Sequence, residues 1–147
     1  MNNILHIPLY IGIILQKNNE IFLIQRANTN WMSGYWNFPG GLVEKDETIR
    51  QAACREAKEE IGVTIVPQDF TVAHVLHVHK NEINTQDIVG IYFKTHQWSG
   101  QAINAEPNKI IAADWFDLRK LPHNITEHAL LAIDGLKEKN YYSEHGW

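Results

Sequence analysis

The sequence predicts a mixed α/β fold, in which helices cover a mixed β-sheet. Short runs of β-branched and aliphatic residues, bounded by polar turns, recur along the chain and are typical of strands. Two other stretches repeat their apolar residues with the period of a helix. With 147 residues, 44% of them hydrophobic, the chain is long enough to bury one sizeable core. We therefore treat residues 1–147 as a single domain.

The first two strands are predicted over Leu9–Leu15 and Ile21–Gln25, because the polar stretch 17–20 between them has the composition of a hairpin turn. A loop rich in glycine and aromatic residues, Asn28–Gly41, follows and ends in Phe38-Pro39-Gly40-Gly41. Proline fixes one backbone torsion and the two glycines permit positive φ angles. We therefore expect a tight turn at the end of this loop and no helix within it.

A helix is predicted between Thr48 and Gly62, where apolar residues recur at four-residue intervals. Thr48 and Gln51 fit a capping box, and Gly62 is suited to end the helix. The rest of the chain predicts a second helix over Glu127–Lys139 and strands over Val63–Val66, Phe70–Val78, Ile88–Phe93 and Ala112–Phe116. The C-terminal aromatic residues, Tyr141, Tyr142 and Trp147, either fold back on the domain or pack on a partner.

Composition and charge limit the partners of the chain. Thirteen basic and seventeen acidic residues give a net charge of −4, which disfavours long nucleic acids and anionic membranes as partners. Small phosphorylated ligands remain compatible with an acidic site that holds divalent metal ions. The longest early apolar run, Leu9–Leu15, is far shorter than the ~20 residues of a membrane-spanning helix. The single cysteine, Cys54, excludes an intrachain disulfide and indicates a reducing, cytoplasmic location.

Three glutamates fall on one side of the first predicted helix. At ~100° per residue, Glu56, Glu59 and Glu60 lie at roughly 0°, −60° and +40°, beside the alanines that should face the core. Crowded carboxylates raise one another's pKa unless a cation lies among them, and an all-oxygen ligand set favours magnesium or manganese. The alternative is a solvated charged face with Arg55 and Lys58 as partners.

The residues around this cluster add to the case for a site. Arg55 precedes Glu56 directly and cannot face the same way, so we expect it to orient Glu59, four residues later. Before the helix, the bare backbone of Gly40 and Gly41 can approach a phosphate or offer a carbonyl to a metal.

Together these residues resemble the Nudix box. The pattern is Gly41, five residues, Glu47, seven residues, and then Arg55-Glu56-Ala57-Lys58-Glu59-Glu60-Ile61-Gly62-Val63. Ala57 is smaller than the usual aliphatic residue, and Asp46 stands where glycine is frequent, but neither change removes a ligand. Segments 18–27 and 37–41 look like the N-terminal half of MutT-type nucleoside triphosphate pyrophosphohydrolases, and segment 115–122 is similar to the Trp-Phe…Leu-Pro segment of Nudix domains.

The resemblance implies a Nudix α/β/α sandwich with a mixed β-sheet, whose box forms a loop, a helix and a loop. It implies magnesium-dependent hydrolysis, with manganese as a substitute, of a nucleoside diphosphate linked to another group. By this resemblance Glu56, Glu59 and Glu60 hold the metal, and the Gly40 carbonyl is a further ligand. Arg55 would orient Glu59, Glu47 and Gly62 would be structural, and Glu56 is favoured over the other glutamates as the general base.

Residues outside the box have competing interpretations. Glu106 is the candidate for an additional metal ligand, with Asp87 and Asp114 as rivals and a solvated loop carboxylate as the alternative. Arg26 either contacts the phosphates or base of a substrate or is a solvated arginine at a strand end. Asn124 either reads a base edge or caps the second helix.

Aromatic residues and histidines also have two interpretations each. Phe38 and Trp36 could form an aromatic wall for a base, although one of them is expected in the core, and Gly41 is expected to contact substrate. Trp31 and Tyr35 are better placed to meet a ligand. The histidines in and just after the predicted strand Phe70–Val78 are expected on the sheet surface: His74, His77 and His79. Contact of His77 with a substrate is the alternative.

The sequence therefore predicts a hydrolase that cleaves nucleoside triphosphates, normal or oxidised, to the monophosphate and pyrophosphate. An enzyme acting on ADP-ribose or another nucleoside-diphosphate-linked compound is the first alternative, and a non-catalytic nucleotide sensor is the second. The partners expected are a small nucleotide and, since the resemblance is compatible with it, a second copy in a homodimer.

Overall fold

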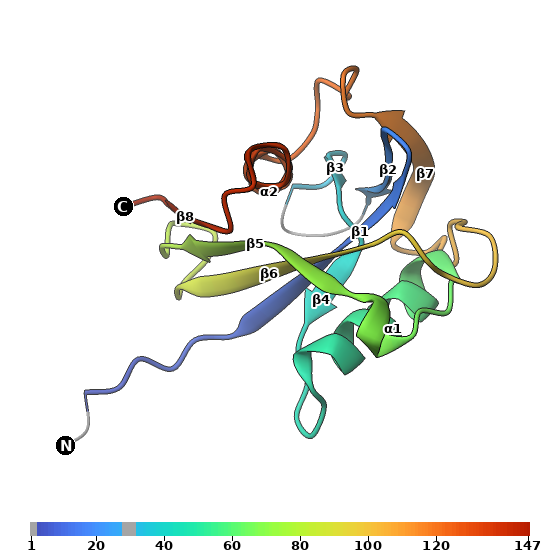
Figure 1. Cartoon of the computed structure of the whole chain (residues 1–147). Coiled ribbons are helices and arrows are strands. Elements are labelled where there is room, and N and C mark those ends of the chain that lie inside the picture. The colour runs from blue at the N-terminus through green and yellow to red at the C-terminus, as the bar shows by residue number, and fades with distance from the viewer. Residues whose placement is uncertain (1–2, 28–31) are drawn as a thin grey trace.

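The computed structural model describes residues 3–27 and 32–147 and has a mixed sheet with one helix on each face (Figure 1). This arrangement confirms the predicted fold class. The elements are β1 (Leu9–Lys17), β2 (Glu20–Arg26), β3 (Trp36–Asn37), β4 (Gly40–Leu42), α1 (Ile49–Ile61), a 3₁₀ turn (Pro67–Asp69), β5 (Thr71–Val78), β6 (Ile88–Thr95), β7 (Ile110–Asp117), α2 (Glu127–Glu138) and β8 (Tyr142–His145).

The strands of the described part of the chain follow the order β3-β2-β1-β6-β5-β8, with β4 paired to β1 and β7 to β2. The β1–β6 and β5–β8 pairs are parallel, and the other pairs are antiparallel. The predicted hairpin of β1 and β2 is present, but the two strands pair only next to the turn, at Gln16 with Ile21 and Lys17 with Glu20. Beyond that end β1 pairs with β6 and β4, whereas β2 pairs with β7.

Two hydrophobic cores lie on opposite faces of the sheet, because successive strand residues point to opposite sides. On β1, Ile13 packs into the core under α1, and its neighbour Ile14 packs into the core under α2. The first core holds the alanines of α1 against large rings of the sheet: Ala52, Ala53, Ala57, Phe22, Phe70 and Phe93. The second holds α2 in the same way: Ala129, Ala132, Ile133, Phe38, Leu76 and Tyr92.

Both ends of α1 form as its local sequence predicts. Thr48 accepts a hydrogen bond from the Gln51 backbone, and the Gln51 side chain bonds back to the Thr48 backbone, which completes the capping box. Gly62 ends the helix in the left-handed region, at φ 72°, where its N–H donates to the Lys58 carbonyl. These caps set the length of the helix that carries the three glutamates.

Two sequence predictions about local structure are wrong. Val63–Val66 is not a strand: Thr64 makes only an isolated bridge with Ser99, because Pro67 opens a 3₁₀ turn directly afterwards. Gly40 and Gly41 form strand β4 instead of a tight turn, and neither has a positive φ. Their lack of a side chain serves close packing, since a Cβ on Gly40 would meet the carbonyl oxygen of Ile11 on β1.

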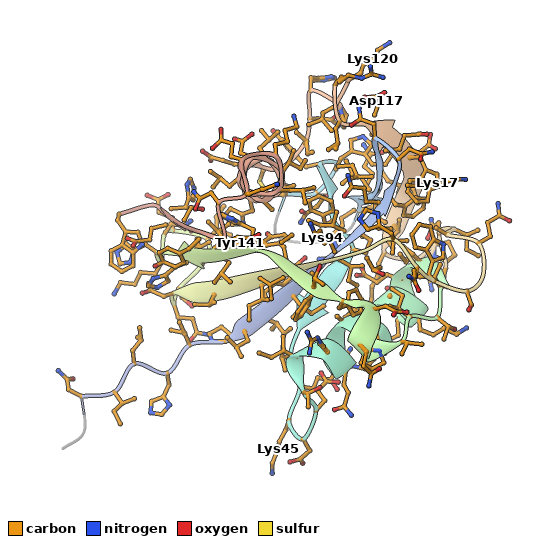
Figure 2. The ribbon with its side chains drawn as sticks, in the orientation of Figure 1. Lys17, Lys45, Lys94, Asp117, Lys120 and Tyr141 are labelled. Carbon is orange, nitrogen blue, oxygen red and sulfur yellow. The ribbon has the colours of Figure 1, made fainter. Side chains whose placement is uncertain are left out.

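The C-terminal residues fold back onto the domain, which is one of the two outcomes expected for them. After α2 the chain returns to the sheet, where Tyr141 lies beside β5 (Figure 2) and its carbonyl accepts the Val75 N–H at 2.8 Å. The strand β8 then pairs with β5, and Trp147 stacks on His79 with ring centroids 4.2 Å apart.

His74 is a further correction, because it is buried instead of lying on the sheet surface. Its Nδ1 donates to the Asn140 carbonyl at 2.7 Å, and its Nε2 lies 2.7 Å from the Ser143 hydroxyl. His77 and His79 are partly exposed and both face Asp87.

Neither α1 nor α2, the helices of the described residues, has the length and apolarity needed to cross a bilayer.

Candidate active site

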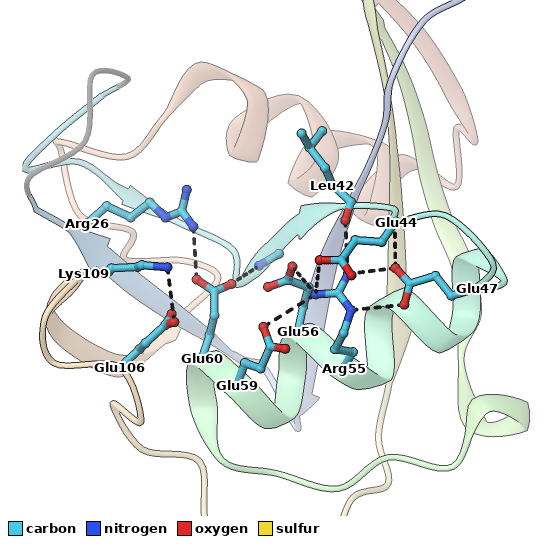
Figure 3. Close-up of polar contacts among 11 residues, drawn as sticks. Arg26, Leu42, Glu44, Glu47, Arg55, Glu56, Glu59, Glu60, Glu106 and Lys109 are labelled. Atoms are coloured by element: carbon cyan, nitrogen blue, oxygen red, sulfur yellow. Dashed lines mark hydrogen bonds and ion pairs between the residues drawn. The ribbon is translucent and has the colours of Figure 1, made fainter.

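The three glutamates of α1 lie along one side of the helix, and we call Glu56, Glu59 and Glu60 the acidic face (Figure 3). Their side chains differ in exposure: Glu60 is 2% exposed, Glu56 13% and Glu59 51%. The acidic face therefore passes from the solvent into the protein interior. This arrangement differs from a solvated charged face, in which all three side chains would be exposed.

Glu60 is the most deeply placed carboxylate. Its Oε1 accepts the backbone N–H of Gly40 at 2.7 Å, and its Oε2 accepts Nη2 of Arg26 at 3.1 Å. Burial raises the pKa of Glu60 to about 7, although Arg26 and the Gly40 N–H both favour the charged form. Arg26, at the end of β2, is thus an ion-pair partner of the acidic face and not a solvated arginine.

Glu56 lies against the backbone of β4. A Cβ on Gly41 would collide with its carboxylate, so glycine at this position leaves the space that Glu56 occupies. Burial raises the pKa of Glu56, and the ion pair with Arg55 opposes that shift. Arg55 Nη1 donates to Glu56 Oε1 at 2.8 Å and is 3.5 Å from Glu59. The prediction that Arg55 turns away from Glu56 is therefore wrong, because a long side chain can bend back to its neighbour.

Arg55 also holds the loop between β4 and α1. Its Nε and Nη2 donate to the two oxygens of Glu47 at 3.1 and 2.8 Å, and Nη2 donates to the Leu42 carbonyl at 3.2 Å. This two-point contact raises the pKa of Arg55 and lowers that of Glu47. Glu47 in turn accepts the Glu44 N–H at 2.7 Å. One arginine thus connects the loop to the acidic face.

Glu106 lies next to the C-terminal end of the acidic face. The N–H of Ala105 donates to the Glu60 carbonyl at 3.0 Å, which brings Glu106 to this end of α1 (Figure 3). Its carboxylate is 3.5 Å from Lys109 Nζ. The rival acids are engaged elsewhere: Asp87 accepts the Lys80 N–H and His79, and Asp114 accepts the N–H of Trp115.

The acidic face has the donor chemistry of a site for a hard divalent cation. Within residues 3–27 and 32–147, no three His, Cys, Asp or Glu side chains are arranged to hold a metal ion as they stand. Arg26 and Arg55 take up Glu60 and Glu56 instead. Besides burial, the charge of Glu59 raises the pKa of Glu56, and the charge of Glu56 raises that of Glu60, so a cation among these oxygens would relieve their repulsion. The residues therefore fit magnesium or manganese.

A pocket is lined by residues of the sheet, among them Arg26, and by His128 of α2. Most of its wall is apolar, with a few polar groups, as in sites for small organic ligands. Its lining residues are Tyr10, Arg26, Asn37, Leu76, Val78, Asn84, Ile88, Gly90, Tyr92 and His128. Sequence reasoning missed Tyr10 and Asn37, since neither belongs to the box and the pocket arises only when β1, β3 and α2 are assembled.

The remaining predicted site residues make structural contacts within the domain. Phe38 is 1% exposed and packs edge-on against Tyr92 in the core, so its ring has no free face for a base. Asn124 Nδ2 donates to the Gly34 carbonyl at 2.9 Å, and the cap of α2 is Thr126, so the cap prediction for Asn124 is wrong. Trp36 packs on Phe116.

Two aromatic residues of the loop remain. Tyr35 is 40% exposed, which leaves part of its ring open to a ligand. Trp31 lies outside the described residues.

Comparisons with known proteins agree on one family. A family model described as the NUDIX domain matches residues 6–134. The 8-oxo-dGTP diphosphatase of Escherichia coli K12 is 37% identical over 91 residues, 62% of this chain and 67% of that protein. The ADP-ribose pyrophosphatase of Methanocaldococcus jannaschii is 32% identical over 138 residues, 92% of this chain and 77% of that protein.

A solved structure shares the fold as well as sequence. The MutT NUDIX hydrolase of Burkholderia pseudomallei superposes with a TM-score of 0.81 and 28% identity, covering 89% of this chain and 98% of that one. The fold of this chain, a mixed sheet with one helix on each face, is therefore the architecture that the resemblance to the Nudix box implies.

Proposed function

The chain belongs to the NUDIX domain family and is a hydrolase, and we propose that it is a magnesium-dependent pyrophosphohydrolase of nucleoside triphosphates. The products would be the nucleoside monophosphate and pyrophosphate, from normal or oxidised nucleotides. The observation that carries the proposal is the position of Arg26, which pairs with Glu60 and also lines the pocket. A nucleotide with its base in the pocket would thus have its phosphates at the acidic face.

Glu56, Glu59 and Glu60, with Glu106 and the Gly40 carbonyl, are the groups we propose to hold magnesium. Bound magnesium would supply charge neutralisation for the phosphates and a lowered pKa for the attacking water. Arg26 would be released from Glu60 when the cation takes that carboxylate, and its guanidinium would then be free to bind a phosphate oxygen.

Glu56 is the residue we favour as general base. Its carboxylate is mostly buried beside Gly41, and its raised pKa makes it a better proton acceptor near neutral pH than an exposed glutamate. Arg55 holds Glu56 at 2.8 Å and is itself fixed by Glu47, so the base would meet the substrate in a set orientation. The proton of the attacking water would pass to Glu56 as the oxygen attacks phosphorus, and the bridging phosphorus–oxygen bond would break to release the nucleoside monophosphate and pyrophosphate.

The first experiment is pyrophosphate and phosphate release from canonical and oxidised nucleoside triphosphates, ADP-ribose and dinucleoside polyphosphates, with magnesium. Glu59→Gln removes a half-exposed carboxylate of the acidic face, and Glu44→Gln is the matched control on an exposed acid that is 3.7 Å from Arg55. We expect pyrophosphate from triphosphates with the native protein and Glu44→Gln, and a large loss with Glu59→Gln. Absence of pyrophosphate from every triphosphate would overturn the proposal.

ADP-ribose hydrolysis is the second candidate. It is favoured by the archaeal relative named ADP-ribose pyrophosphatase, which aligns with 92% of this chain. The same panel separates the two candidates, because ADP-ribose yields AMP and ribose 5-phosphate without pyrophosphate. Turnover of ADP-ribose alone would favour this second function.

The setting of the enzyme is also a proposal. A single cysteine, Cys54, is compatible with the reducing cytoplasm, and the net charge of −4 disfavours long nucleic acids. Sedimentation of the purified protein would decide between a monomer and the homodimer compatible with the family.

A further inference from the structure

Asn37 is a buried polar residue in the wall of the pocket, only 3% exposed. It lies on the short strand β3, immediately before Phe38. Its Oδ1 accepts the backbone N–H of Phe38 at 2.8 Å and the hydroxyl of Thr126 at 3.1 Å. Within the described residues, this buried amide has a fully used oxygen and no partner for its nitrogen, which requires an explanation.

The orientation of this amide follows from its partners. A backbone N–H can only donate, so the atom that faces Phe38 must be the oxygen. The Thr126 hydroxyl accepts the Ala129 N–H at the start of α2, and its single hydrogen is therefore available for Asn37 Oδ1. These contacts exclude the flipped amide, which would place an NH₂ group against the N–H of Phe38.

The amide nitrogen consequently remains for the pocket. Nδ2 makes no hydrogen bond within the part of the chain that the structure describes. Solvent also reaches this nitrogen. Among the described residues, His77 Nε2 is the one side-chain nitrogen or oxygen that is both inaccessible to solvent and without a hydrogen-bond partner. An accessible nitrogen on a residue that lines the pocket points two N–H donors at whatever binds there.

We propose that Asn37 determines base specificity, by donating to a ring carbonyl oxygen of the nucleobase. This inference rests on the proposed function, because it takes the pocket as the base site. A keto base, such as hypoxanthine, guanine or uracil, offers the oxygen that the fixed N–H donors require. An amino group at the same ring position would place donor against donor and leave a buried polar group unpaired.

The experiment compares two matched pairs of substrates, ITP with ATP and UTP with CTP. Within each pair a carbonyl and a ring N–H replace an amino group and a bare ring nitrogen. Asn37→Asp is the test variant, because its carboxylate keeps one oxygen for Phe38 and Thr126 and turns the donor into an acceptor. Asn81→Asp is the control for the added charge: it is exposed, and its oxygen accepts only backbone N–H groups of its own loop.

We expect kcat/KM of the native protein to favour the keto member of at least one pair by about 10-fold to 100-fold. Asn37→Asp is expected to bring that ratio to about one or to reverse it, and Asn81→Asp is expected to keep it. Equal turnover of both members of both pairs, or an unchanged ratio in Asn37→Asp, would overturn the inference while the proposed function stands.

Absence of pyrophosphate from all four triphosphates would instead overturn the proposed function. Calorimetric binding of IMP and AMP then decides the inference, since these monophosphates test the pocket without turnover. Tighter binding of IMP that is lost in Asn37→Asp supports it. Equal binding of the two, or no binding of either, overturns it.

Discussion

At the residue scale, the buried carboxylate of Glu60 couples folding to pH. Its pKa is about 7 in the folded protein and 4.5 for the free side chain. Because folding raises this pKa, the stabilisation is fully present below about pH 4.5 and is lost as the pH rises through about 7. Without metal, the free energy of unfolding contributed by this group should fall by about 2 kcal/mol between pH 5 and pH 8. Denaturant unfolding at a series of pH values measures this slope.

Glu60→Gln is the control for this prediction, since its amide oxygen can still accept the Gly40 N–H and has no charge to titrate. The variant is expected to lose this part of the pH dependence. Magnesium at saturation should also flatten the native slope, because a bound cation favours the charged carboxylate. Identical slopes for the native protein and Glu60→Gln would show that Glu60 does not titrate in this range.

Arg55 is the residue whose geometry a lysine cannot reproduce. Its guanidinium contacts both oxygens of Glu47 and also Glu56, whereas a lysine is a single point charge. We expect Arg55→Lys to lower the free energy of unfolding by about 1–3 kcal/mol. We also expect it to lower kcat, because Glu56 loses its fixed partner.

Arg119→Lys is the matched control. Arg119 makes the same two-point contact with Asp117, but its side chain is 81% exposed. The loss of stability there should be small, because solvent screens an exposed ion pair, and kcat should stay unchanged. Thermal melting and single-substrate kinetics of both variants give the comparison, and equal effects of the two substitutions would contradict the role assigned to Arg55.

At the element scale, strand β4 is shaped by the helix it faces. Gly41 lies where a Cβ would collide with the Glu56 carboxylate. Its backbone is not in the left-handed region, so alanine costs no torsional strain there. Gly41→Ala should therefore displace Glu56 and lower kcat by tenfold or more, with the free energy of unfolding changed by no more than about 1 kcal/mol.

Gly100→Ala is expected to give the reverse pattern. Gly100 has φ +91°, and a Cβ there would make only ordinary van der Waals contacts. Alanine at this position therefore meets torsional strain and no crowding. Stability should fall by about 1 kcal/mol while kcat stays near the native value. Parallel loss of stability and activity in both variants would mean that Gly41 serves only the packing of β4.

The success of the sequence predictions follows the range of the interactions involved. Helix α1 could be predicted with both ends, because the contacts that cap each end are local. Thr48 pairs with Gln51 at the start, and Gly62 donates to the Lys58 carbonyl at the end. Strand β8 could not, because Tyr142–His145 becomes a strand through pairing with β5 and through the contact of Ser143 with His74, 69 residues away. Val63–Val66 has strand composition, but Val63 and Ile65 fill the core under α1 without a partner strand, and Val66 is exposed.

The same distinction applies to the site. The spacing of the box predicts that three carboxylates share one side of α1, which the structure has. Spacing does not predict the partners that hold them, since Arg26 reaches Glu60 from another strand and Arg55 bends back to its neighbour. Asn37 has no local signal at all, because its free nitrogen results from contacts with Phe38 and Thr126 on different elements.

At the scale of the whole molecule, the C-terminal strand closes the edge of the sheet next to the pocket. Strand β5 supplies Leu76 and Val78 to the pocket wall, and β8 covers its outer edge by parallel pairing from Val75 to Val78. The buried His74 depends on the same segment, because both of its ring nitrogens contact residues after α2. An exposed β5 edge would be a template for pairing with other chains.

A chain that ends at Asn140 tests this coupling. It loses the β5–β8 pairing, the Ser143 partner of His74 and the stacking of Trp147 on His79. We expect its melting temperature to fall by about 5 °C or more and light scattering to increase. Since Leu76 and Val78 remain in the chain, KM should rise more than kcat falls, because the acidic face lies on the other helix.

Trp147→Ala separates the strand from its last side chain. Trp147 is 67% exposed, so its contact with His79 should contribute about 1 kcal/mol or less. If this variant reproduced the whole effect of the truncation, the stacking of Trp147 and not the pairing of β8 would hold the edge. If the truncated chain melted like the native protein, the wall of the pocket would be independent of the C-terminal strand, and β5 would hold Leu76 and Val78 in place without β8.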